Sequence, residues 1–271
     1  MNEKIGLIGT GMMGGALFRA LSKVVSAQNI FLFDVFKEKA IDFAKELGGA
    51  NVCTSAETLT ENCDVIFLAV KPQHLEGLIT DISSKELEQK LLVSIAAGVK
   101  IEKIKLLFEK NSCKPKRIIR LMPNLPATVG QAMIALCADE DASTDDVAFV
   151  KNLLSQAGLI EQVPEKLMDC VTGISGSGPA FVFMFIEALA DAAVMCGMPR
   201  AQAYIYAAQT VKGSAAMLLE TGKNPGMLKD AVCSPAGTTI AGVKALEDGA
   251  FRATTMNAVI NATKRSEELG K

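Results

Sequence analysis

The pattern of hydrophobic and polar positions changes once along the chain, near residue 162. Before that point, short apolar runs alternate with amphipathic stretches, and the runs predict strands over residues 5–8, 30–34, 65–70, 91–95 and 118–121. The run at 65–70 is apolar throughout, which is typical of a strand buried on both faces of a parallel sheet. The stretches at 37–47 and 101–108 have helical spacing. We therefore predict a doubly wound α/β domain over residues 1–162.

Beyond residue 163 the strand signal stops, and helices are predicted over residues 180–196, 200–221, 227–232, 239–246 and 251–269. The first of these is apolar on nearly every side, which a helix on the surface of a monomer would not tolerate. Glu187 and Asp191 interrupt the most apolar stretch of this region, residues 181–198, and that stretch is shorter than the roughly 20 residues that a membrane-spanning helix needs. We expect an all-helical second domain over residues 163–271, a partner subunit that covers part of this helix, and no membrane partner.

Composition narrows the classes of function. Hydrophobic residues make up 49% of the chain and charged residues 21%, which predicts a large core rather than disorder. Lysine and arginine (28) nearly balance aspartate and glutamate (30) without a basic stripe, so no nucleic-acid partner is expected. Seven scattered cysteines and the lack of a signal-peptide pattern favour reduced thiols in a cytoplasmic protein. His74 is the single histidine, so we expect no metal site. Because His74 follows a strand far in sequence from the likely substrate segment, we expect it to face solvent rather than to act as a catalytic base.

A Gly-x-Gly-x-x-Gly turn follows the first predicted strand and opens a helix over residues 15–21. Glycines at this spacing permit a tight turn, the approach of a pyrophosphate to the backbone, and close packing of helix on strand. The spacing alone is a weak signal, but Asp34 stands at the end of the second predicted strand, where such folds place an acidic residue. We expect a dinucleotide site here; the alternative is a plain strand–helix turn. The predicted contacts are Ile8, Gly9, Thr10, Gly11, Met12, Met13, Gly14 and Asp34.

Asp34 also bears on the choice of cofactor. A carboxylate at this position accepts hydrogen bonds from the adenosine ribose hydroxyls and repels a 2′-phosphate, which favours NADH. Lys37 stands near enough in sequence to offset part of that repulsion, so NADPH stays open.

Unusual residues also follow the other predicted strands. Ligands of open parallel sheets bind at the carboxyl ends of strands. Small residues at 96–98 permit a flat ring to lie close, and Asn124 offers an amide to a carboxamide or ribose. Alternatively, Pro72 and Pro123 merely end their strands. The cofactor contacts predicted here are Val70, Lys71, Pro72, Ala96, Ala97 and Asn124.

In the helical half, two turns rich in glycine, serine and proline lead into helices, at residues 173–180 and 234–239. The second offers a helix N-terminus with hydroxyls, which suits a carboxylate, although both are equally explained as capped turns.

These two turns carry a resemblance to a known family. Gly176-Ser-Gly-Pro-Ala180 and Ser234-Pro-Ala-Gly-Thr-Thr239 resemble the two signatures of pyrroline-5-carboxylate reductases. The glycine turn, Val70-Lys-Pro72, Met122-Pro-Asn124 and Leu228-Lys-Asp230 match in the same order, so the resemblance covers essentially the whole chain.

The resemblance implies a Rossmann domain followed by a helical dimerisation domain. It implies an oxidoreductase that uses NADH or NADPH to reduce Δ1-pyrroline-5-carboxylate to L-proline, the last step of proline biosynthesis, by hydride transfer to the C=N carbon. It also implies a homodimer, or a larger assembly of dimers, with active sites at the dimer interface.

Carried onto this chain, the resemblance also assigns the substrate site. The backbone around Gly237, Thr238 and Thr239 would hold the carboxylate, within the Ser234 segment, and the Thr239 hydroxyl would act at the imine nitrogen. Glu165 falls where the family carries a carboxylate near the substrate.

Two positions depart from the family pattern, because Ala236 and Leu125 stand where the family usually has Gly and Thr. Ala236 would be costly if that position needs a positive φ.

Two other functions are weighed against this one. A β-hydroxyacid dehydrogenase of the 3-hydroxyisobutyrate type needs a lysine on the helix after a glycine-rich turn, and residues 181–186 contain none. A non-catalytic NAD(P)-sensing module would leave the 234–239 turn without a role.

Overall fold

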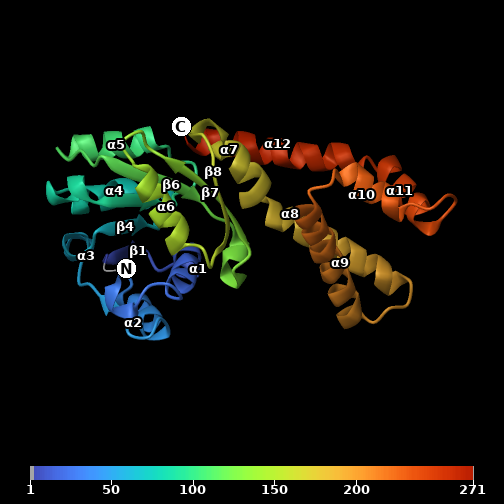
Figure 1. The fold of residues 1–271 in the computed structure, drawn as a ribbon, viewed down its shortest axis with the longest axis horizontal. Helices are drawn as coiled ribbons and strands as arrows, with labels where there is room; N and C mark the ends of the chain where they lie inside the picture. Colours follow the sequence, from blue (N-terminus) through green and yellow to red (C-terminus); the bar gives the residue numbers. More distant parts are fainter. Residues whose placement is uncertain (1–2, 271) are drawn as a thin grey trace. The chain divides into compact units, whose positions relative to one another are not determined.

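The computed structural model describes residues 3–270, which form two compact units (Figure 1). The first unit runs to Ser177 and also takes in the end of the chain from Asn261, while the second comprises residues Gly178–Ile260. The sequence predicted a domain boundary between residues 162 and 163, and that boundary stays a prediction.

The first unit is built on one eight-stranded sheet with the strand order β3-β2-β1-β4-β5-β6-β7-β8. Its strands are β1 (Ile5–Ile8), β2 (Ile30–Phe33), β3 (Asn51–Val52), β4 (Val65–Leu68), β5 (Leu91–Ser94), β6 (Arg117–Met122), β7 (Ala132–Ala138) and β8 (Gly158–Gln162). All neighbouring strands pair in parallel except β6 and β7, which are antiparallel. The order steps outward in both directions from β1 and β4, as in a doubly wound sheet, and it confirms the predicted fold class.

Helices cover both faces of this sheet. The helices of the unit are α1 (Met12–Leu21), α2 (Lys37–Glu46), α3 (Ala56–Asn62), α4 (Pro72–Ile82), α5 (Ile101–Lys110), α6 (Thr144–Leu153) and α7 (Met168–Val171), followed by a π-helical turn, Thr172–Gly176. One core cluster packs α1, α2 and α6 on the sheet, and a second packs α3, α4 and α5. β1 and β4 are buried throughout, as expected for strands covered on both sides.

The second unit is helical. It contains α8 (Gly178–Met195), α9 (Arg200–Thr221), α10 (Pro225–Val232), α11 (Thr238–Asp248) and the first part of α12 (Phe251–Leu269). α8 and α9 bury Ala190, Ala203 and Ala207 between them. Most large apolar side chains of this unit are exposed, including Met184, Ile205 and Leu219.

Candidate active site

The glycine turn has the close contacts that its spacing predicts. Gly9 has a φ of +100°, and a Cβ added there would lie 2.6 Å from the carbonyl oxygen of Ala69. A Cβ on Gly14 would lie 2.5 Å from the carbonyl oxygen of Gly9, so helix and strand meet at a distance that only glycine allows. Gly11, the N-cap of α1, faces open space, and no side chain caps the helix there. The first N–H groups of α1 are therefore available to an anion.

Asp34 is tied to this turn. Its Oδ2 accepts hydrogen bonds from the Thr10 backbone N (2.8 Å) and the Thr10 hydroxyl (2.9 Å), and its Oδ1 accepts one from the Phe36 N (3.0 Å). The sequence pattern did not predict this link, which fixes the end of β2 to the glycine turn across 24 residues.

The predicted strand ends lie along one edge of the sheet. The register aligns Ile8 with Leu68 of β4, Leu68 with Ser94 of β5, and Ser94 with Arg120 of β6. Residues 9–14, 70–72, 96–97 and 124 therefore follow parallel strands at the same carboxyl edge, which is where open α/β sheets bind nucleotides. Lys71 is the N-cap of α4 and Pro72 its first residue, while His74 is exposed one turn later, as expected.

Asn124 is buried at this edge with its amide already engaged. Its Oδ1 accepts from the Met133 N (3.1 Å), and its Nδ2 donates to the Ser175 carbonyl (3.0 Å). The side chain thus ties β6 to β7 and to the π-helical turn. Its predicted contact with a carboxamide or ribose stays a prediction.

A buried ion pair lies beside this edge. Arg120, on β6, is only 2% exposed, and its Nη1 lies 3.1 Å from Oε1 of Glu165. The same Oε1 accepts from the Ile101 N (2.8 Å), the first residue of α5. Sequence reasoning missed Arg120, although a charged residue inside an apolar strand is itself a signal, because it requires a buried partner.

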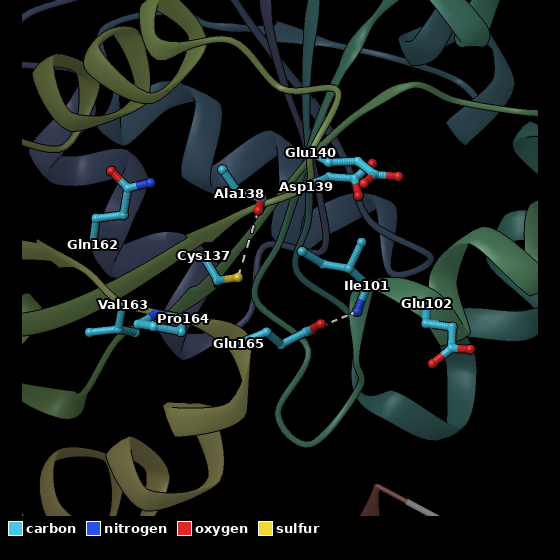
Figure 2. Close-up of a pocket in the computed structure, with 10 residues that line it drawn as sticks. All are labelled: Ile101, Glu102, Cys137, Ala138, Asp139, Glu140, Gln162, Val163, Pro164 and Glu165. Atoms are coloured by element: carbon cyan, nitrogen blue, oxygen red, sulfur yellow. Dashed lines mark hydrogen bonds between the residues drawn. The ribbon is translucent and has the colours of Figure 1, made fainter.

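Glu165 also lines an open pocket of about 610 Å³, whose other residues are Ile101, Glu102, Cys137, Ala138, Asp139, Glu140, Gln162, Val163 and Pro164 (Figure 2). Burial, and next the charge of Glu165, raise the pKa of Cys137 to about 11, so its thiol stays protonated at neutral pH. Four carboxylates line the pocket, which makes it a poor site for a pyrophosphate.

The predicted substrate turn lies in the second unit, where Gly237 is the N-cap of α11 and no side chain caps the helix. Thr238 is exposed and Thr239 half-buried in its first turn. The uncapped N–H groups and the hydroxyl of Thr239 thus stand together at a helix N-terminus, as a carboxylate site requires. A Cβ on Gly237 would collide with the Ser234 hydroxyl, which keeps the turn tight.

Ala236, which stands where the family usually has glycine, adopts the left-handed backbone conformation. Its φ is +56°, so the methyl group stands where glycine is favoured. For an L-residue this conformation costs about 1–2 kcal/mol.

The predicted residues thus form two groups. The cofactor residues gather at one sheet edge of the first unit, and Glu165 also belongs to that unit. Ser234, Gly237, Thr238 and Thr239 gather at the start of α11 in the second.

Fold and glycine turn define the class: a dinucleotide-binding α/β protein that continues into a helical unit. Residues 4–98 match the family model described as NADP oxidoreductase, coenzyme F420-dependent, and residues 165–269 match pyrroline-5-carboxylate reductase dimerisation. The chain is 45% identical to the pyrroline-5-carboxylate reductase of Methanosarcina acetivorans, covering 100% of this chain and 99% of the relative. It is 42% identical to that of Escherichia coli, covering 100% of both. The chain belongs to the pyrroline-5-carboxylate reductase family.

Solved structures agree with this assignment. Plasmodium falciparum pyrroline carboxylate reductase with NADP bound has a TM-score of 0.88 at 33% identity, covering 100% of this chain and 99% of that chain. The enzyme from Coxiella burnetii has a TM-score of 0.88 at 32% identity, covering 100% of both chains. Family membership decides against the β-hydroxyacid dehydrogenase alternative.

Proposed function

We propose that this protein reduces Δ1-pyrroline-5-carboxylate to L-proline with a reduced nicotinamide cofactor, the last step of proline biosynthesis. The observation that carries the proposal is the turn at residues 234–239, which presents an uncapped helix N-terminus and the Thr239 hydroxyl. In a family of pyrroline-5-carboxylate reductases, this turn has the donors that a cyclic amino acid carboxylate needs.

The described residues fit the cofactor. The open space at Gly11 and the free N–H groups of α1 suit a pyrophosphate, and the close packing at Gly9 and Gly14 keeps the turn in that shape. Ile8, Thr10, Met12, Met13, Asp34, Val70, Lys71, Pro72, Ala96, Ala97 and Asn124 complete the proposed cofactor site.

The protein contributes orientation and electrostatics rather than a strong acid. When bound, the reduced nicotinamide supplies hydride to the C=N carbon. The backbone around Gly237, Thr238 and Thr239 holds the substrate carboxylate within the Ser234 turn, with the N–H groups of Thr238 and Thr239 as donors because the Gly237 N already donates to the Ser234 carbonyl (3.0 Å). The Thr239 hydroxyl fixes the imine nitrogen. Because a protonated imine is already electrophilic, a hydroxyl suffices at this position. Glu165 supplies a carboxylate near the substrate.

NADH is the preferred cofactor in this proposal. The negative charge of Asp34 at the end of β2 disfavours a 2′-phosphate, and Thr10 and Phe36 hold that carboxylate in place. NADPH remains a usable alternative, since Lys37 lies three residues further on.

The active form in this proposal is a cytoplasmic homodimer, or an assembly of dimers. By length and composition, the helical stretch Glu165–Met195 could cross a membrane, and only 6% of its most apolar window is buried. A second copy explains this exposed surface better, because residues 165–269 match a dimerisation family. All seven cysteines are free, as in a reducing compartment.

Substitution of Thr239 tests the proposal. We expect Thr239→Ala to lower kcat about 100-fold while the dissociation constant of NADH stays unchanged, because the hydroxyl acts on the substrate only. Thr239→Ser keeps the hydroxyl and should recover most of the turnover. Thr254→Ala on α12 is the matched control. Wild-type protein that binds NADH but never oxidises it with pyrroline-5-carboxylate would instead identify a sensing module.

A further inference from the structure

The loop between β5 and α5, residues 95–100, follows a strand at the cofactor edge of the sheet. Ala96 and Gly98 are buried, while Ala97 is exposed. Gly98 has a φ of +75°, so the loop turns back at this residue. Under the proposed function, on which this inference rests, Ala96 and Ala97 lie against the cofactor. Whatever holds this loop therefore sets the shape of the cofactor site.

Glu165 holds one end of the loop. Its Oε1 accepts from the Ile101 N at 2.8 Å, directly after residue 100, so a negative charge stands at the N-terminus of α5. Arg120 approaches the same oxygen from the sheet, and its burial leaves it little freedom to move. The loop is thereby fixed to β6 through an ion pair that joins residues 45 positions apart.

The end of the chain holds the middle of the loop. Residues 266–270, here called the C-terminal turn, lie on Gly98: a Cβ added to Gly270 would lie 2.6 Å from the Gly98 carbonyl oxygen. The Gly270 N donates to the Ser266 carbonyl (3.1 Å), which closes the turn. Ser266 is 5% exposed, and its hydroxyl donates to Oδ1 of Asp169 on α7 at 2.6 Å. The C-terminal turn is thus fixed to the unit that carries the cofactor residues.

We propose that Glu165 and the C-terminal turn are positioning elements for the cofactor: they clamp residues 95–100 and so set the affinity for NADH without touching it. Oε1 of Glu165 is engaged by both Ile101 and Arg120, so the positioning role uses a hydrogen-bond acceptor for Ile101 and a negative charge opposite Arg120.

The Gly270→Ala variant tests the C-terminal turn. The added methyl group pushes against the Gly98 carbonyl, and we expect NADH affinity to fall about three- to tenfold. Gly77→Ala, on the exposed face of α4 with open space around it, is the matched control and should leave NADH binding unchanged. Binding is followed by the fluorescence of NADH itself. Unchanged NADH affinity in a folded Gly270→Ala variant overturns the proposal for this turn.

Should Gly270→Ala fail to fold, Ser266→Ala provides the second variant. It removes only the hydrogen bond to Asp169, and it should weaken NADH binding about two- to fivefold. A lower melting temperature with unchanged NADH affinity would mean that the turn is merely structural, and it would overturn the proposal.

Glu165→Ala and Glu165→Gln separate positioning from substrate contact. Glu165→Ala removes both the acceptor for Ile101 and the charge opposite Arg120, and it should weaken NADH binding about three- to tenfold. Glu165→Gln keeps an acceptor for Ile101 but loses the charge, so it should weaken NADH binding less than Glu165→Ala does. Glu161→Ala, exposed on β8, is the control. If Glu165→Ala raises only the KM for pyrroline-5-carboxylate, Glu165 is a substrate contact and the positioning role is wrong.

Because NADH binding is measured without turnover, these experiments can be distinguished from a failure of the proposed activity. That failure would appear as a wild-type protein that binds NADH and oxidises none.

Discussion

At the scale of the single residue, Asp34 holds the glycine turn through its hydrogen bonds with Thr10, and the proposed function gives the same carboxylate a second role against the ribose. We expect Asp34→Ser to shift the ratio of kcat/KM values toward NADPH by about tenfold, since the charge that repels the 2′-phosphate is removed. The loss of the Thr10 bonds should also lower the melting temperature. Steady-state kinetics with both cofactors measure the shift, and Glu38→Ser, a nearby exposed acid, is the control. An unchanged cofactor ratio would remove Asp34 from the account of specificity.

Ala236 has a backbone conformation that is unfavourable for a residue with a Cβ atom. With its φ of +56°, we expect Ala236→Gly to raise the free energy of unfolding by up to about 1 kcal/mol, because glycine adopts this conformation without strain. Ala241→Gly, inside α11, is the control and should lower stability by about 1 kcal/mol. Denaturant unfolding measures both. Equal losses at the two positions would show that Ala236 carries no strain.

At the scale of elements, the sequence predicted five strands, the helices α1, α2 and α5, and the helices of the second unit, with ends that differ from the structure by few residues. It did not predict α3, α4 or α6. β1, β2, β4, β5 and β6 could be predicted because apolar runs buried on both faces are distinctive. β3 has two residues, and β7 consists largely of alanine and cysteine, which give little strand signal. The antiparallel pairing of β7 follows from the short connection after β6, since a parallel crossover needs about a dozen residues or more.

The candidate site was predictable to the extent that it is local in sequence. The glycine turn and the start of α11 are short motifs whose geometry follows from their own residues. Arg120 with Glu165, and Gly98 with the C-terminal turn, depend on contacts across many residues. Neither the hydrophobic periodicity of the sequence nor the spacing of its motifs indicates such pairs, so they can be found only in the three-dimensional structure.

α8 is the element that predicts assembly. It is apolar on nearly every side, interrupted by Glu187 and Asp191, and only Ala190 is buried, while Phe183 is 55% exposed. Such a surface on a helix indicates a protein partner. We expect Phe183→Glu to shift the protein toward a monomer, measured by light scattering, because a charge in a closed apolar interface is costly. Leu106→Glu, exposed on α5, should leave the assembly unchanged. A Phe183→Glu protein of wild-type size would place the interface elsewhere.

At the scale of the whole molecule, the proposed binding residues lie in two units. The first unit contains the carboxyl edge of the α/β sheet with the proposed cofactor residues, and the second contains the N-terminus of α11, which suits a carboxylate. In the proposed function these parts serve one reaction. It is tested most directly by mixing purified protein with Δ1-pyrroline-5-carboxylate and following oxidation of NADH and, separately, NADPH by the absorbance of the reduced nicotinamide. We predict oxidation with L-proline as the product, at a higher kcat/KM for NADH. Oxidation of neither cofactor would contradict the account.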